Sequence, residues 1–160
     1  MIFVTVGTQL PFDRLIKVID FWAKDSNSNV YAQTGPTDTI YTNIECVKYL
    51  QQSHFEKYFT DAEVIIAHAG MGSILNALTC GKPIILMPRL ASLGEHRNDH
   101  QVATAQRFEN VDGIFVAWDE EQLLDYLRKI IDQNLTVKTS KISEYASSDI
   151  LDKLKNIISK

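Results

Sequence analysis

Residues 63–89 read EVIIAHAGMGSILNALTCGKPIILMPR and carry the strongest structural signal in the chain. The apolar run Val64–Ala67 is typical of a buried strand, and the pattern after Gly70 predicts a helix that ends near Gly81. A second apolar run from Pro83 to Met87 predicts the next strand. Strand, glycine turn, helix and strand in this order form a βαβ unit, whose two strands lie parallel in one sheet.

The same alternation continues on both sides of this unit. Further strands are expected at residues 2–6, 30–33, 44–50 and 113–118, and helices at residues 11–19, 54–60, 94–108 and 119–131. Apolar strands that alternate with helices predict an α/β fold with a doubly wound parallel sheet. We expect one domain over residues 1–160, in which residues from about 134 to 160 form a polar linker and a C-terminal amphipathic helix.

Composition excludes several classes of protein. The net charge of −4 argues against a dedicated nucleic-acid binder. Cys46 and Cys80 lie far apart and are expected to be free thiols in a reducing compartment. The sequence begins without the basic flank of a signal peptide, and no apolar run approaches the roughly 20 residues that span a bilayer. We therefore expect a cytoplasmic protein that reaches a membrane only through something else.

The glycine turn at residues 70–73 is the first candidate binding site. Gly70 and Gly72 allow a ligand to approach the backbone, the following helix presents unpaired N–H groups, and Ser73 adds a hydroxyl. These groups suit a diphosphate, although a tight strand-to-helix turn without a ligand also explains the glycines. A usual dinucleotide fingerprint fits less well, because it needs a glycine where Leu75 stands.

Two further segments are expected at the same edge of the sheet. Gly7, Thr8 and Gln9 follow the first strand and form either a second backbone cradle or a plain loop. Residues 94–101, GEHRNDHQ, offer groups that donate and accept hydrogen bonds, as sugar hydroxyls require, although such a run is also typical of a solvated helix face. His96 and His100 have the i, i+4 spacing of a metal pair, but no third ligand accompanies them, so no metal is expected.

Three motifs together resemble a known family. The stretches FVTVGTQLPFDRLI, AHAGMGSILNAL and MPRLASLGEHRNDHQ are similar to the C-terminal, donor-binding domain of glycosyltransferase family 28. Within it they resemble the stand-alone subunits called Alg13-like or PssE-like, which include a bacterial exopolysaccharide and capsule branch. The resemblance extends from Met1 to about Ile131 and implies the Rossmann-like donor-binding half of a GT-B glycosyltransferase.

The resemblance also implies roles for individual residues. The residues that it assigns to the donor diphosphate are Gly7, Thr8, Gln9, His68, Gly70, Met71, Gly72 and Ser73. It assigns Asn76 to the ribose, where many relatives carry a glutamate, and Glu95, His100 and Gln101 to the donor sugar. An asparagine oxygen accepts a weaker hydrogen bond than a carboxylate does. Buried packing is an alternative for His68, and Arg89 receives no role.

The implied function is that of the UDP-sugar-binding subunit of a two-component inverting glycosyltransferase in polysaccharide synthesis. Its implied partner is a membrane-attached Alg14-like or PssD-like subunit that binds a lipid-linked saccharide acceptor and supplies the catalytic base. The protein would then lie at the inner face of the membrane and need no cofactor or obligatory metal. Two alternatives remain: a non-catalytic stabiliser of a partner glycosyltransferase, and a free-standing nucleotide-binding regulatory domain.

Overall fold

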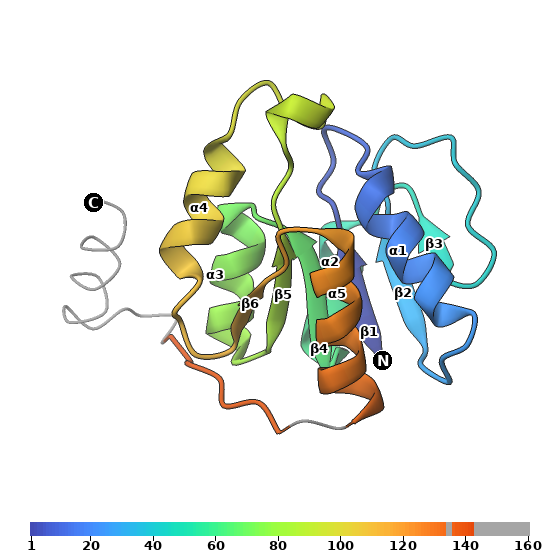
Figure 1. The fold of residues 1–160 in the computed structure, drawn as a ribbon. Helices are drawn as coiled ribbons and strands as arrows, with labels where there is room; N and C mark the ends of the chain where they lie inside the picture. The colour runs from blue at the N-terminus through green and yellow to red at the C-terminus, as the bar shows by residue number, and fades with distance from the viewer. Residues whose placement is uncertain (134–135, 143–160) are drawn as a thin grey trace.

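The structure, a computed structural model, describes residues 1–133 and 136–142. Within these residues the chain forms one six-stranded sheet in the order β3-β2-β1-β4-β5-β6, and every neighbouring pair is parallel (Figure 1). The strands are β1 (Ile2–Thr5), β2 (Val30–Gln33), β3 (Glu45–Val47), β4 (Val64–His68), β5 (Ile84–Met87) and β6 (Ile114–Val116). The predicted doubly wound parallel sheet is thus confirmed.

Helices cover both faces of the sheet (Figure 1). Helices α1 (Asp13–Ala23) and α5 (Glu120–Leu127) pack on one face, and α2 (Gln52–Asp61), α3 (Met71–Cys80) and α4 (His100–Phe108) pack on the other. Alternate residues of each strand enter opposite cores: Val4 packs toward α1, whereas Phe3 packs against the aromatic side chains of α2. Burial on both faces explains why the strands are apolar throughout.

The centre of the sheet contains a topological switch point. β1 and β4 are neighbours, but the chain leaves β1 toward β2 and leaves β4 toward β5. The loops that follow β1 and β4 therefore diverge at the carboxyl edge of the sheet, which is uppermost in Figure 1. In open α/β sheets this is where ligands bind.

The helix expected at residues 94–108 was predicted too long. The structure has a short 3-10 turn, η1 (Ala91–Leu93), then irregular backbone, and α4 begins only at His100. Gly94 adopts a left-handed φ of +69°, which ends the 3-10 turn. The Asp99 carboxylate accepts a hydrogen bond from the backbone N–H of Ala91 at 3.0 Å, and such side-chain bonds to the backbone compete with helix formation.

The other differences concern ends of elements. The strand expected at residues 44–50 contains only Glu45–Val47. Asp119 caps α5 as predicted by accepting a hydrogen bond from the N–H of Gln122, and the helix continues as a π-helical turn, η2 (Arg128–Asp132). Residues 136–142 form neither helix nor strand in the structure. The predicted C-terminal helix lies outside the described residues.

Candidate functional site

The turn between β4 and α3 leaves a helix N-terminus open. The N-cap of α3 is Gly70, so no side chain caps the helix. The first N–H groups of a helix have no partner within it, and together with the helix dipole they attract an anion. A Cβ atom built on Gly72 would meet nothing within 4 Å, so a ligand has room to approach the backbone there.

Gly70 is required for a different reason. A Cβ atom at this position would overlap Nε2 of His68, so any larger residue would force the imidazole to move. A Cβ atom on Gly7, whose φ is +78°, would lie 3.1 Å from Cε1 of the same ring. The His68 side chain therefore lies between the two glycine segments and holds them apart.

His68 is neutral at physiological pH. Burial, together with the nearby positive charge of Arg89, lowers the pKa of His68 to about 4. Its Nδ1 atom lies 3.5 Å from the backbone oxygen of Thr5. At pH 7 the ring can donate or accept a hydrogen bond toward a ligand, but it carries no charge to offset a phosphate.

The first of two hollows at this edge has a volume of about 290 Å³. It brings together five of the predicted site residues, which come from the loop after β1, the end of β4 and the first turn of α4: Gly7, Thr8, Gln9, His68 and Gln101. Arg89 and His96 complete its polar wall. The side-chain oxygen of Gln101 accepts a hydrogen bond from the backbone N–H of Arg89 at 3.1 Å, which fixes the orientation of the carboxamide.

The second hollow has a volume of about 250 Å³ and shares Gly7 and Thr8 with the first. It contains three predicted residues of the α3 turn and helix: Gly72, Ser73 and Asn76. Gly70 and Met71, which were also assigned to the diphosphate, line neither hollow, and their assignment stays a prediction. Leu50 and Phe55 add an apolar wall. The loop after β1 thus separates a polar hollow from a partly apolar one, and the start of α3 faces the second.

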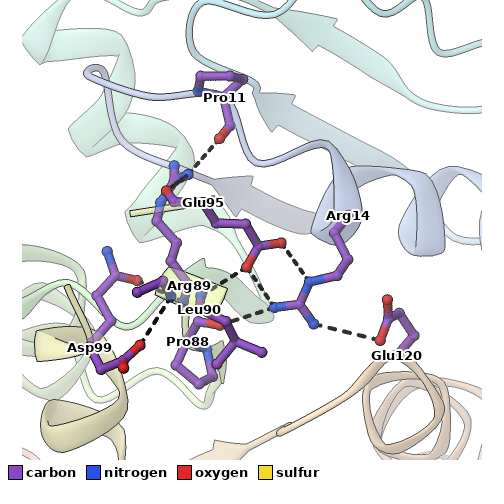
Figure 2. Close-up of polar contacts among 10 residues, drawn as sticks. Pro11, Arg14, Pro88, Arg89, Leu90, Glu95, Asp99 and Glu120 are labelled. Atoms are coloured by element: carbon purple, nitrogen blue, oxygen red, sulfur yellow. Dashed lines mark hydrogen bonds and ion pairs between the residues drawn. The ribbon is translucent and has the colours of Figure 1, made fainter. Parts of the chain in front are cut away.

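Two of the predicted sugar-binding residues line neither hollow as found here. His100 is exposed at the first position of α4. The carboxylate of Glu95 accepts hydrogen bonds from Arg14 at 2.6 and 2.9 Å and from the backbone N–H of Leu90 at 2.9 Å (Figure 2). Both of its oxygens are therefore used within the chain. The assignment of His100 and Glu95 to a donor sugar stays a prediction.

Sequence reasoning missed four contributors to these hollows. Arg89 follows β5 at the same edge, and its burial could not be read from one charged residue after an apolar run. Leu50 and Phe55 come from the end of the β3 loop and from α2, which lie close to α3 only in the folded chain. His96 lines the first hollow but lies outside α4, so its expected helical pairing with His100 was wrong.

In residues 1–133 and 136–142, no three His, Cys, Asp or Glu side chains gather closely enough to hold a metal ion. Nor does any helix in this part of the chain have the length and apolar character needed to cross a membrane.

Comparison with known proteins identifies relatives. The chain matches the glycosyltransferase family 28 C-terminal domain over residues 1–157. The UDP-N-acetylglucosamine transferase subunit ALG13 of Candida albicans is 33% identical over 67 residues, which are 42% of this chain and 22% of the relative. The UDP-N-acetylglucosamine--N-acetylmuramyl-(pentapeptide) pyrophosphoryl-undecaprenol N-acetylglucosamine transferase of Prochlorococcus marinus is 26% identical over 160 residues, 97% of this chain and 43% of the relative. The chain spans less than half the length of both relatives.

Solved structures share the fold. The solution structure of ALG13 matches with a TM-score of 0.63 at 17% identity, over 96% of this chain and 93% of that one. The glycosyltransferase of kitacinnamycin matches with a TM-score of 0.61 at 16% identity, over 81% of this chain and 34% of that one. The calicheamicin glycosyltransferase CalG4 matches with a TM-score of 0.58 at 17% identity, over 83% and 35%. The expected Rossmann-like half of a GT-B glycosyltransferase is thereby confirmed as the fold.

Proposed function

Since this chain belongs to the glycosyltransferase family 28 C-terminal domain family, we propose that it is the donor-binding subunit of a two-component inverting transferase that uses a UDP-sugar. The observation that carries the proposal is the pair of hollows that meet at Gly7 and Thr8, beside the uncapped start of α3. A nucleoside diphosphate sugar consists of a nucleoside, a diphosphate and a sugar in this order, and the carboxyl edge of the sheet offers a place for each.

The two hollows differ in the chemistry that they suit. The second hollow, with the apolar walls of Leu50 and Phe55 and the carboxamide of Asn76, suits a nucleoside. The first hollow, with Gln101 and His96 on its wall, suits sugar hydroxyls. The diphosphate then lies between them, against the amides of the Gly7 loop and the first turn of α3.

The proposed reaction displaces UDP from the anomeric carbon of the sugar by an acceptor hydroxyl. Negative charge grows on the departing diphosphate as that bond breaks. The N-terminus of α3 and the glycine amides are fixed before the reaction begins, and preorganised groups of this kind typically contribute several kcal/mol to catalysis. His68 contributes a hydrogen bond rather than a charge, because its pKa of about 4 keeps it neutral. No divalent ion is required in this proposal.

The acceptor half and the catalytic base come from a partner in this proposal. The Candida relative is named as a subunit of a transferase, and the structural match covers 93% of ALG13 but only about a third of the kitacinnamycin and calicheamicin glycosyltransferases. A membrane-attached Alg14-like or PssD-like chain that binds a lipid-linked saccharide would complete the cleft and hold this protein at the cytoplasmic face. The bacterial exopolysaccharide or capsule role belongs to the same proposal.

Co-expression with such a partner tests the proposal. The complex is assayed with a panel of UDP-sugars and lipid-linked acceptors, with and without EDTA, and with Gln101→Ala beside wild type. We expect UDP-sugar binding by this chain alone, turnover only by the complex, the same turnover in EDTA, and a large loss of turnover in the variant. A chain that binds no UDP-sugar and whose Gln101→Ala complex keeps full turnover would instead be a non-catalytic stabiliser. Transfer by this chain alone would refute the two-component scheme.

A further inference from the structure

Arg89 is a buried cation whose hydrogen bonds go to backbone oxygens. Its side chain is 2% exposed. Nη2 donates to the carbonyl oxygens of Val6 at 2.9 Å and Leu10 at 2.7 Å, and Nη1 donates to those of Pro11 and Glu95, the latter at 3.3 Å (Figure 2 shows the contact with Pro11). The four N–H groups of the two terminal nitrogens are therefore all directed at the protein backbone.

This arrangement differs from an ordinary ion pair. Among the described residues, no carboxylate lies within salt-bridge distance of Arg89. Its guanidinium lies 4.6 Å from the centre of the Phe12 ring, and burial lowers the pKa of Arg89 to about 10, so it stays charged at pH 7. Burying a charge is costly unless its hydrogen bonds are satisfied, and here backbone carbonyls satisfy them.

The carbonyls that Arg89 binds show what the burial achieves. Three of the four belong to the segment from Val6 to Pro11, which follows β1. This segment contains Gly7 and Thr8, the residues that separate the two hollows. We propose that Arg89 is a positioning residue for donor binding, which holds the loop after β1 in its binding shape without itself donating a terminal N–H to the ligand. The identity of the ligand rests on the proposed function.

Arg89 also connects this loop to the rest of the site. Its own backbone N–H binds the Gln101 side chain, so one residue fixes both the Gly7 loop and a wall of the first hollow. Arg14 fixes the backbone next to Arg89. It donates two hydrogen bonds to the Glu95 carboxylate and one to the Pro88 carbonyl at 3.2 Å (Figure 2). Glu95 therefore supports the position of Arg89 from within the protein.

The test compares Arg89→Lys and Arg89→Met with wild type. Two measurements are made on each: UDP affinity by calorimetry, and amide hydrogen exchange at Val6 and Gly7 in the free protein. The N–H groups of these two residues donate to the Gln33 carbonyl at 3.2 Å and to the Thr5 hydroxyl at 3.3 Å, so their exchange reports loosening of the loop. A lysine keeps the charge, but its single ammonium has three donors and no planar fork, so it cannot bind four spread carbonyls. We expect faster exchange at the loop in both variants and a loss of UDP affinity of at least about tenfold in both.

Two controls separate positioning from general stability. Arg107→Met removes an exposed arginine from α4 that lines neither hollow, and Ile130→Val mildly weakens the core far from the hollows. Both should keep wild-type loop exchange and UDP affinity. Wild-type affinity in Arg89→Lys would show that charge alone matters, and unchanged loop exchange in both Arg89 variants would equally overturn the proposal. Should wild type bind no UDP, either alone or with an acceptor subunit, while the loop still loosens in both variants, the proposed function would fail and the positioning of the loop by Arg89 would stand.

Discussion

His68 shows how one side chain can shape a site and make the whole fold sensitive to acid. Its imidazole lies between Gly7, which follows β1, and Gly70, which follows β4. The ring is neutral in the folded protein, because burial and the charge of Arg89 oppose its protonation. In the unfolded chain the ring has an ordinary pKa of about 6.5. The unfolded state therefore binds a proton in a pH range where the folded state does not, and acid favours unfolding.

The expected consequence is a loss of stability as the pH falls from about 6.5 to about 4. The difference between a pKa of about 4 in the folded protein and about 6.5 in the unfolded chain contributes about 3 kcal/mol to the free energy of unfolding. This contribution is fully present above pH 6.5 and is lost as the pH falls toward 4. Urea unfolding of wild type and His68→Gln at pH 7 and pH 4 measures the difference, since other titrating groups are common to both. A wild-type protein that loses no more stability than the variant over this range would show that His68 is not buried as described.

Asn76 tests the assignment of the second hollow to a nucleoside. It is exposed on α3 beside Gly72 and Ser73, so replacing it should not disturb folding. If its carboxamide accepts a hydrogen bond from a ribose hydroxyl, Asn76→Ala should weaken UDP binding about five- to tenfold, because such a bond contributes roughly 1 kcal/mol. Asn76→Glu should bind UDP at least as tightly as wild type, because a carboxylate is the stronger acceptor.

Inorganic pyrophosphate serves as the control for Asn76. It lacks the ribose, so its affinity should be the same in wild type and in Asn76→Ala. An equal loss of UDP and pyrophosphate affinity would place Asn76 near the phosphates and contradict the ribose assignment.

Gly70 and Gly72, at the start of α3, are expected to serve different purposes: Gly70 makes room for the His68 ring, and Gly72 makes room for the ligand. Substitutions should separate these two effects. Gly70→Ala places a methyl group against the His68 ring and should destabilise the fold by about 1–3 kcal/mol. Gly72→Ala meets no atom within 4 Å and should be neutral or stabilise α3 by up to about 1 kcal/mol. Gly72→Leu should leave the fold intact but abolish UDP binding, because its side chain fills the second hollow.

Thermal unfolding and UDP titration of the three glycine variants check these expectations. Gly72→Ala is the matched control for Gly72→Leu, since both remove the same glycine. Unchanged UDP affinity in Gly72→Leu would mean that the ligand does not approach the start of α3.

Features that depend on local sequence patterns were predicted correctly, whereas features that depend on hydrogen bonds between separate segments were not. The strands and α3 were predictable because apolar runs and the glycine turn are local patterns, and the left-handed Gly81 ends α3 where expected. The segment before α4 was mispredicted because the hydrogen bond that the Asp99 carboxylate accepts from Ala91, together with the left-handed Gly94, outweighs the helical pattern. The roles of Arg89 and Glu95 depend on partners about 80 positions away, Leu10 and Arg14, which no local pattern reveals.

The site was predictable in membership but not in arrangement. Parallel strands bring the ends of β1, β4 and β5 to one edge, so residues after them were expected to lie together. The division into two hollows depends on the loop at Gly7 and Thr8, which lines both, and the buried Arg89 binds the carbonyls of Val6 and Leu10 in this loop. Side-chain packing of this kind is determined by the whole fold.

The molecule has its own core on each face of the sheet, so it is expected to fold and bind a donor without a partner. Both cores are filled by residues of this chain, and both hollows are formed by it alone. A ligand that binds only the folded state stabilises it by about 2.7 kcal/mol at a concentration of 100 times Kd. For a chain of 160 residues this corresponds to a rise in Tm of roughly 5–10 °C.

Thermal unfolding of the isolated chain with UDP, uridine or pyrophosphate measures this effect. At concentrations scaled to each Kd, the three ligands should raise the Tm by similar amounts. At one fixed concentration, UDP should raise the Tm more than uridine or pyrophosphate does, because it alone occupies the phosphate position and the second hollow together. The Gly72→Leu variant should show no UDP shift. If wild type shows none either, but gains one when the acceptor subunit is added, then the donor site is completed only by the partner, and the edge of this sheet binds the diphosphate only within the assembled enzyme.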